Sequence, residues 1–205
     1  STPLFVLLAA RYAARTGDLE TIAALWPNIL AALNWIDRYG DLDGDGFVEY
    51  QRRTEQGLAN QGWKDSQDSV PHADGRLARG PIALVEVQAY VYAAKREIAD
   101  VASLLGYDAL ASRLTQQAEA LRQHFEEAFW CPAIGTYALA LDGDKQQCAV
   151  RTSNPGHGLY CGIVSPERAP AVVETLMNRN SFSGWGIRTM AAGESRYNPI
   201  SYHNG

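Results

Sequence analysis

The chain of 205 residues lacks long apolar runs and any excess of positive charge. Its longest apolar run, Leu4–Ala10, is far shorter than the roughly 20 residues that span a bilayer. No basic start and cleavage site mark a signal peptide. Lys and Arg number 18 against 23 Asp and Glu, which gives a net charge of −5. This balance argues against nucleic acid or an anionic membrane as the partner.

Cysteine is also scarce, and the common nucleotide and hydrolase motifs are missing. Cys131, Cys148 and Cys161 are an odd number without a CxxC pair. A disulfide framework is therefore not expected, and we predict a cytoplasmic protein in which the cysteines are small apolar residues. The chain has no P-loop, no GxGxxG after a strand, no GxSxG and no HExxH, which removes the nucleotide-binding, triad-hydrolase and zinc-protease interpretations.

The remaining composition is that of a globular protein, with 46% hydrophobic and 20% charged residues. Length alone predicts one domain or a small pair. The chain begins inside a helix-start signal, Ser1–Pro3, and stops at a polar turn, His203–Gly205. We therefore expect residues 1–205 to be a partial domain with both ends truncated.

Apolar periodicity predicts three helix pairs, each with a nearly all-apolar inner helix and an amphipathic outer helix. The predicted ranges are 4–15 with 18–36 (kinked or restarted at Pro27), 81–105 with 108–129, and 155–164 with 165–177. Pro3 and Gly17 are typical of the start and end of a helix, and Asp18 and Ser165 of N-caps. Three pairs cannot close a ring, so the pattern predicts about half of a helical-hairpin toroid.

Three long loops separate the pairs, at residues 39–80, 130–154 and 179–205. Loops of this length in a compact domain are usually functional, and we expect all of them at one end, beside the N-termini of the inner helices. Within the second loop, residues 136–141 and 147–151 predict a β-hairpin around a turn at 142–145.

The first loop contains the strongest catalytic candidate, Asp65, in the stretch Asn60–Ser69. If Gly62–Ser66 is extended, Trp63 and Asp65 face one side and Lys64 the other. An aromatic face stacks on a sugar ring, and an apolar wall keeps a neighbouring carboxyl protonated, as a general acid requires. We predict that Asp65 is a proton donor and that Lys64 points away from it, toward Asp68 or a substrate hydroxyl. The alternative is a pair of loop aspartates that make turns and caps.

An acidic stretch, Asp41–Glu49, lies earlier in the same loop. Its spacing matches the front of a calcium loop, with ligands predicted at Asp41, Asp43, Asp45, Phe47 (through its carbonyl) and Glu49. The twelfth position is Arg52 where an EF-hand has a bidentate Glu. A true EF-hand is therefore not expected, and the open alternatives are a calcium ion completed by another carboxylate or an Asp/Gly turn without an ion.

Further polar and aromatic residues are candidates for binding a sugar. Trp185 offers a stacking face, and the groups offered for hydroxyls are those of Arg188, Tyr202, His203 and Asn204, each with loop packing as the alternative. Glu86 and Gln88 are polar residues in an otherwise apolar inner helix, which predicts that they line a cavity. His157, at the start of the third inner helix, is a weaker candidate of the same kind.

Several motifs together resemble bacterial glycogen-debranching, amylo-α-1,6-glucosidase-like proteins. They are Thr2–Phe5, Leu25–Pro27, Asp41–Tyr50, Asn60–Ser66, Gly184–Thr189 and Tyr197–Gly205. The resemblance covers essentially the whole chain. It implies a partial (α/α)6 barrel of the six-hairpin glycosidases and inverting hydrolysis of an α-glucosidic bond in an α-glucan or oligosaccharide. Asp65 resembles the general acid of a Gly-Trp-Asp motif, here with one Lys inserted, which leaves Asp68 as a minor rival.

The resemblance also implies a general base, a Glu beyond Gly205, so residues 1–205 alone are expected to be inactive. No cofactor is required for such chemistry. The rival interpretations are another glycosidase on the same barrel, such as a trehalase or a mannosylglycerate-type hydrolase, and a non-catalytic carbohydrate-binding protein.

Overall fold

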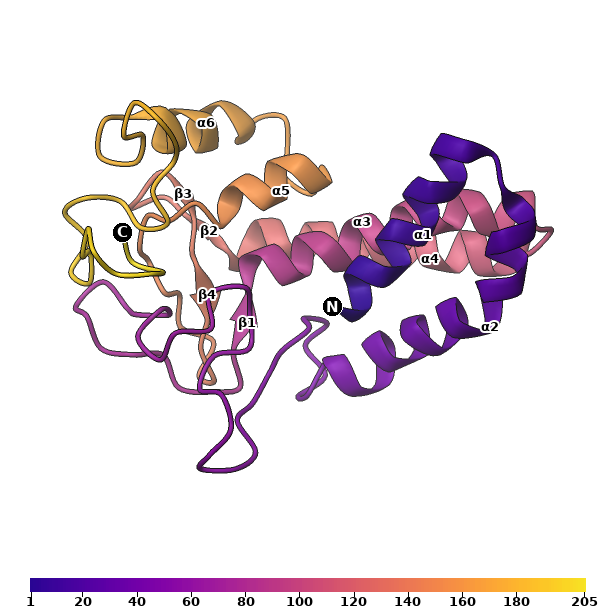
Figure 1. Ribbon diagram of the computed structural model, residues 1–205, viewed down its shortest axis with the longest axis horizontal. Coiled ribbons are helices and arrows are strands. Elements are labelled where there is room, and N and C mark those ends of the chain that lie inside the picture. Colours follow the sequence, from indigo (N-terminus) through magenta and orange to yellow (C-terminus); the bar gives the residue numbers. More distant parts are fainter.

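The computed structural model describes all of residues 1–205 and is mainly helical (Figure 1). In chain order the elements are α1 (Thr2–Thr16), α2 (Leu19–Trp35), the π-helical turn η1 (Ile36–Gly40), β1 (Ala83–Leu84), α3 (Val85–Leu104), α4 (Asp108–Ala128), β2 (Trp130–Cys131), β3 (Thr136–Tyr137), β4 (Ala140–Leu141), α5 (Pro155–Cys161) and α6 (Ala169–Met177). None of the helices has the length and hydropathy needed to cross a membrane.

The helices form the three predicted pairs, with α3 as the central inner helix. It contacts α1, α4 and α5, and 13 of its 20 residues are buried, against five of the 21 in α4. The short links also behave as predicted. Gly17 ends α1 in the left-handed conformation (φ 71°), and the Asp18 carboxylate caps α2 by accepting the Thr21 N–H at 2.9 Å.

One side of α1 remains open. Leu4, Phe5, Leu8 and Tyr12 are exposed, Leu8 by 68%, although the opposite side of the helix is buried against α3 and α2. Among residues 1–205 no helix covers this apolar side, and three helix pairs do not close a ring.

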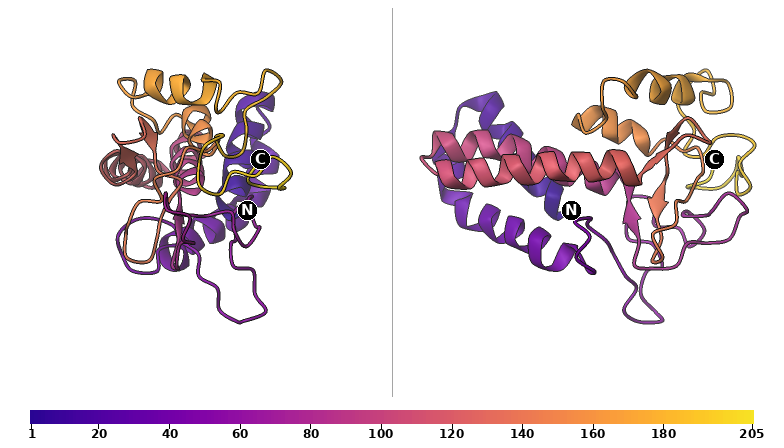
Figure 2. Two further views of the ribbon diagram at one scale, coloured as in Figure 1. Left: turned by 90° about the vertical axis from the view of Figure 1, so that its left-hand side faces the viewer. Right: turned by 180° about the vertical axis from the view of Figure 1, so that it is seen from behind.

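The long loops gather at one end of the helices, as predicted. In Figure 1 they lie to the left, beside the start of α3, and the views in Figure 2 place them at the same end. A small second core under them packs Val70, Ile82, Leu84, Leu139, Ala140, Cys148 and Val150. The loops are therefore a packed unit that can hold side chains in fixed positions.

Several predicted boundaries are wrong because the loops draw residues into pairings. The second inner helix begins at Val85 instead of Pro81, since residues 82–84 pair with Tyr50 and β4. The predicted β-hairpin forms around its turn, where Leu141 bridges Gln147 and backbone hydrogen bonds join Leu139 and Ala140 to Cys148. The start of its first arm, Thr136–Tyr137, instead pairs with β2. The last helix begins at Ala169, after a turn at Ser165, and α2 continues through Pro27 without interruption.

Candidate functional site

The site is built on residues 60–69, which an internal network holds in shape. Asn60 is buried; its Nδ2 donates to the Ser66 carbonyl at 2.8 Å, and its Oδ1 accepts the Tyr50 hydroxyl at 2.8 Å. Ser69 is also buried, and its hydroxyl donates to the Lys64 carbonyl at 2.6 Å. The loop is therefore closed by two buried polar side chains at its ends.

The three residues at the centre of the loop alternate in exposure as an extended segment does. Trp63 is 44% exposed, Lys64 is 3% exposed, and the Asp65 side chain is 56% exposed. The Asp65 carboxylate makes no hydrogen bond within the chain. The structure thus presents an aromatic ring and a free carboxylate on the outer side of one loop and places the intervening cation inside.

Lys64 points into the protein, where its ammonium donates to the carbonyl of Thr189 at 3.2 Å. Burial lowers the pKa of Lys64 to about 8, and the nearby carboxylates of Glu86 and Asp68 oppose that shift. The Lys64 ammonium is therefore directed toward Thr189 and away from the exposed side of the loop.

Two histidine rings flank Trp63. The His157 ring lies 6.2 Å from it at a tilt, and the His203 ring lies 5.8 Å from it edge-on. His157 Nδ1 is 2.8 Å from the Tyr90 hydroxyl, and burial lowers the pKa of His157. A partly exposed indole held in this way keeps a fixed orientation.

The C-terminal segment supplies two buried partners of the loop. His203 and Asn204 are 4% and 1% exposed. His203 Nδ1 lies 2.7 Å from the Ser66 hydroxyl, and Asn204 Nδ2 donates to the Asp68 carbonyl at 3.3 Å. The sequence predicted substrate contacts for both residues, whereas here they bind the loop. The neighbouring Tyr202 is 86% exposed.

Glu86 lies directly behind the loop. It is 1% exposed, and neither carboxylate oxygen has a hydrogen-bond partner. The Asn154 side chain is equally buried and also lacks partners. Burial raises the pKa of Glu86, and Asn154 and the Lys64 ammonium oppose the rise. The structure thus places the Glu86 carboxyl next to residues 60–69, but without access to solvent.

Gln88 does not face a cavity. It is fully buried, its Oε1 accepts the Val48 N–H at 2.9 Å, and its Nε2 donates to the carbonyls of Val48 at 2.7 Å and Leu84 at 3.1 Å. This polar residue in an apolar helix is thus explained by its hydrogen bonds to the backbone of the acidic stretch at Val48.

Trp185 and Arg188 belong to a separate turn. Trp185 is 99% exposed, and Arg188 donates to the carbonyls of Arg179 at 3.3 Å and Asn180 at 3.5 Å. Neither side chain has a hydrogen bond or ring contact with residues 60–69. The structure therefore does not join them to the Trp63–Asp65 site.

The acidic stretch holds a cation from the chain itself. The Lys145 ammonium lies 2.7 Å from Asp43 Oδ2, 2.6 Å from Asp45 Oδ2, and in contact with Glu49 Oε1. Asp41 accepts the N–H groups of Gly44 and Gly46 at 2.7 and 2.9 Å. Oxygens of Asp41, Asp43 and Glu49 also lie within 4.8 Å of one another, a spacing that suits a metal ion.

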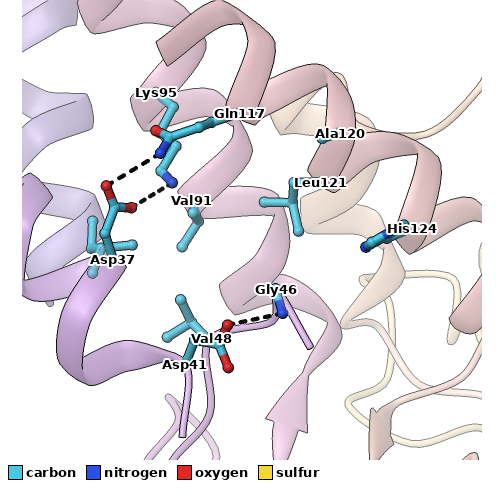
Figure 3. Close-up of a pocket in the computed structure, with 11 residues that line it drawn as sticks. Asp37, Asp41, Gly46, Val48, Val91, Lys95, Gln117, Ala120, Leu121 and His124 are labelled. Atoms are coloured by element: carbon cyan, nitrogen blue, oxygen red, sulfur yellow. Dashed lines mark hydrogen bonds and ion pairs between the residues drawn. The ribbon is translucent and has the colours of Figure 1, made fainter. Parts of the chain in front are cut away.

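A cavity of about 290 Å³ lies on the outer side, between η1, α3 and α4 (Figure 3). Asp37 on its wall pairs with Lys95 at 2.7 Å and with Gln117 at 3.4 Å. Figure 3 shows these groups directed toward one another across the hollow. Most of its polar lining is thus already used, and the cavity contains none of the residues around Asp65.

The sequence did not predict the residues that contact the site from distant parts of the chain. Ser66, Tyr90, Thr189 and Lys145 all contact predicted site residues, yet no local pattern marks the first three. Lys145 had a signal, because it follows an Asp-Gly-Asp turn and is one of only three lysines in an acidic chain.

Solved structures with the same arrangement are glycosidases and a relative without an assigned activity. A GH63 mannosylglycerate hydrolase from Thermus thermophilus, in complex with glucose, is 19% identical with a TM-score of 0.71; the match covers 100% of this chain and 58% of that one. An uncharacterized conserved protein of the same organism is 18% identical with a TM-score of 0.73, over 100% and 60% of the chains.

Neutral trehalase from Saccharomyces cerevisiae is 14% identical with a TM-score of 0.52, over 67% of this chain and 26% of that one. These identities show the fold alone, which is that of the (α/α)6 glycosidases, and this chain spans at most about 60% of the three structures. No curated protein sequence matches the chain. The model of the mannosylglycerate hydrolase MGH1-like glycoside hydrolase domain matches residues 1–205, and the chain therefore belongs to that glycoside hydrolase family.

Proposed function

We propose that residues 1–205 carry the proton-donor side of an inverting glycosidase site, with Asp65 as the general acid. The observation that supports this most is the side-by-side exposure of Trp63 and Asp65 while Lys64 between them is buried. The indole stacks on the C–H face of a sugar ring, and the carboxyl next to it reaches the glycosidic oxygen.

The proposed reaction is a single displacement. Asp65 gives its proton to the leaving oxygen as the C–O bond breaks, while a second carboxylate takes a proton from the water that attacks the opposite face. Inversion requires roughly 6.5–9.5 Å between the two carboxyl groups, to admit that water. Asp65 ends the reaction deprotonated and regains its proton from solvent.

The second carboxylate is proposed to come from outside residues 1–205. Glu86 is buried and cannot contact a water molecule that attacks a sugar. The Asp68 carboxylate lies near the buried Lys64, whose pKa it raises, and Asp68 is only partly exposed. The remaining length of the solved relatives, about 40% of their chains, supports a longer catalytic unit that supplies both this base and the helices that cover α1.

We propose mannosylglycerate as the first substrate to test. The family is the MGH1-like one, and a mannosylglycerate hydrolase has the same fold over the whole chain. This substrate replaces the α-1,6-glucan that the motif resemblance implied. The α-glucosidic substrates of debranching enzymes and trehalose remain the competing class, because Asp65 and the fold would serve them equally.

The test is hydrolysis by the full-length protein. Mannosylglycerate, trehalose, maltose, isomaltose and limit dextrin are compared at equal concentration, and the anomer first released is followed by NMR. We expect hydrolysis of mannosylglycerate with inverted configuration in the released sugar. Preferred hydrolysis of a glucan assigns the debranching alternative. Binding without hydrolysis of all five would contradict the enzyme proposal and favour a carbohydrate-binding protein.

A further inference from the structure

His203 is placed to control the backbone at the proposed acid. It is buried, lies 137 positions from Ser66 in sequence, and its Nδ1 is 2.7 Å from the Ser66 hydroxyl and 3.3 Å from the Ser66 backbone nitrogen. A backbone N–H can only donate, so Nδ1 is the acceptor and the ring proton is on Nε2. The Ser66 hydroxyl is then a second donor to the same Nδ1 lone pair.

The imidazole does not act on Asp65 directly. Its Nδ1 is 3.9 Å from Asp65 Oδ1, too far for a hydrogen bond. The bond to the Ser66 N–H instead fixes the peptide that joins Asp65 to Ser66. The same ring packs edge-on against Trp63 at 5.8 Å. One side chain therefore fixes both the proton donor and the stacking surface next to it.

Two further sets of hydrogen bonds connect the same C-terminal segment to the loop on either side of Asp65. Asn204 Nδ2 donates to the Asp68 carbonyl at 3.3 Å. The Gly205 carbonyl accepts the Thr189 N–H at 2.9 Å and its hydroxyl at 2.7 Å, and the Thr189 carbonyl accepts Lys64 Nζ at 3.2 Å. Residues 203–205 thus bind the loop directly at Ser66 and Asp68, and indirectly at Lys64 through Thr189.

We propose that His203 is a positioning residue for Asp65, acting through the Ser66 peptide, and not a sugar-binding residue. The inference rests on the proposed function of Asp65. It follows from the burial of His203, which removes it from contact with substrate, and from its one acceptor atom, which is used by the residue next to Asp65. A displacement of a reacting group by about 1 Å can lower the rate about 100-fold.

Three substitutions in the full-length protein separate the possible roles. His203→Asn keeps an acceptor near the position of Nδ1, His203→Gln moves the carbonyl toward the position of Nε2, and His203→Leu removes the acceptor. We expect kcat to fall about 10- to 100-fold in the Leu and Gln variants with KM within about threefold, and His203→Asn to recover most of the loss.

Ser66→Ala provides a second variant in case the Leu variant does not fold. It removes the 2.7 Å contact and keeps the backbone donor, so a smaller loss in kcat, about 3- to 10-fold, is expected with KM unchanged. A KM increase at constant kcat would show sugar binding and overturn the inference. Equal activity of the Asn and Gln variants would also overturn it.

Asp65→Asn is measured in the same experiment to keep the two proposals apart. If Asp65→Asn retains hydrolysis, the proposed function fails. If Asp65→Asn is inactive while His203→Leu or Ser66→Ala matches the wild type, only the positioning role of His203 fails.

Discussion

Gly62 lies so close to Leu84 that no side chain fits between them. A Cβ at Gly62 would come within 2.4 Å of Leu84 Cδ1 and 3.4 Å of Glu86 Oε1. Leu84 is buried in the small core beneath the loops and belongs to β1, so it cannot move aside without cost. Because Gly62 has no side chain, residues 60–69 can pack against Leu84 at the start of α3.

Gly62→Ala is therefore expected to destabilise the fold by about 1–3 kcal/mol, the usual cost of overpacking a core. Urea unfolding followed by circular dichroism measures the change. Gly186→Ala is the matched control, because its Cβ would meet no atom within 4 Å and its φ is not positive. Equal stability of the two variants would show that the Gly62 loop is not packed against Leu84.

The Lys145 ammonium lies among the carboxylates that the sequence predicts as calcium ligands. It contacts Asp43, Asp45 and the buried carboxylate of Glu49. We expect Lys145→Met to lose about 1–3 kcal/mol of stability, less than for a fully buried pair since Lys145 is 33% exposed, and to regain it with millimolar calcium.

Thermal unfolding in EDTA and in calcium measures both changes. The wild-type melting temperature should be the same in both. The calcium ion predicted from the sequence remains a prediction, and a wild-type protein stabilised by calcium would show that the metal displaces Lys145 from these carboxylates.

Burial of Lys64 is expected to add stability under alkaline conditions, relative to a variant without this amine. Its pKa is about 8 in the folded protein against an ordinary value of 10.5. Between these values the unfolded chain keeps the proton that the folded one has lost, so the Lys64 contribution to the free energy of unfolding increases with pH, by at most about 3 kcal/mol.

Lys64→Met removes this contribution. The buried thiols of Cys148 and Cys161 and the buried tyrosines lose their protons in the unfolded chain first and so lower stability as the pH rises, but they remain in both proteins. Urea unfolding at intervals from about pH 7.5 to about 10 compares the two. Parallel curves would mean that Lys64 is solvated in the native state and is not held at Thr189.

The helix pairs could be predicted from sequence because burial repeats at helical spacing. α3 is apolar on nearly all sides and lies inside, whereas α4 has one apolar stripe and lies outside. The boundary at Pro81 could not, since residues 82–84 are taken into pairings with Tyr50 and β4, which are distant in sequence.

The site could be predicted only where residues adjacent in sequence determine its geometry. The alternation of Trp63, Lys64 and Asp65 follows from an extended backbone. The contact between Ser66 and His203 spans 137 positions and has no local signature. For the same reason the polar residues near the C-terminus were predicted to bind sugar, although the structure uses two of them to hold the loop.

Asp65→Asn tests the central proposal most directly. In the full-length protein, kcat on the best substrate is measured together with sugar binding by calorimetry, since Asn has the size of Asp but no acidic proton to transfer. We expect kcat to fall at least about 100-fold with binding within about threefold, in line with the contribution of general acid catalysis. Unchanged kcat in a folded, sugar-binding Asp65→Asn variant would contradict the assignment of Asp65 as the proton donor.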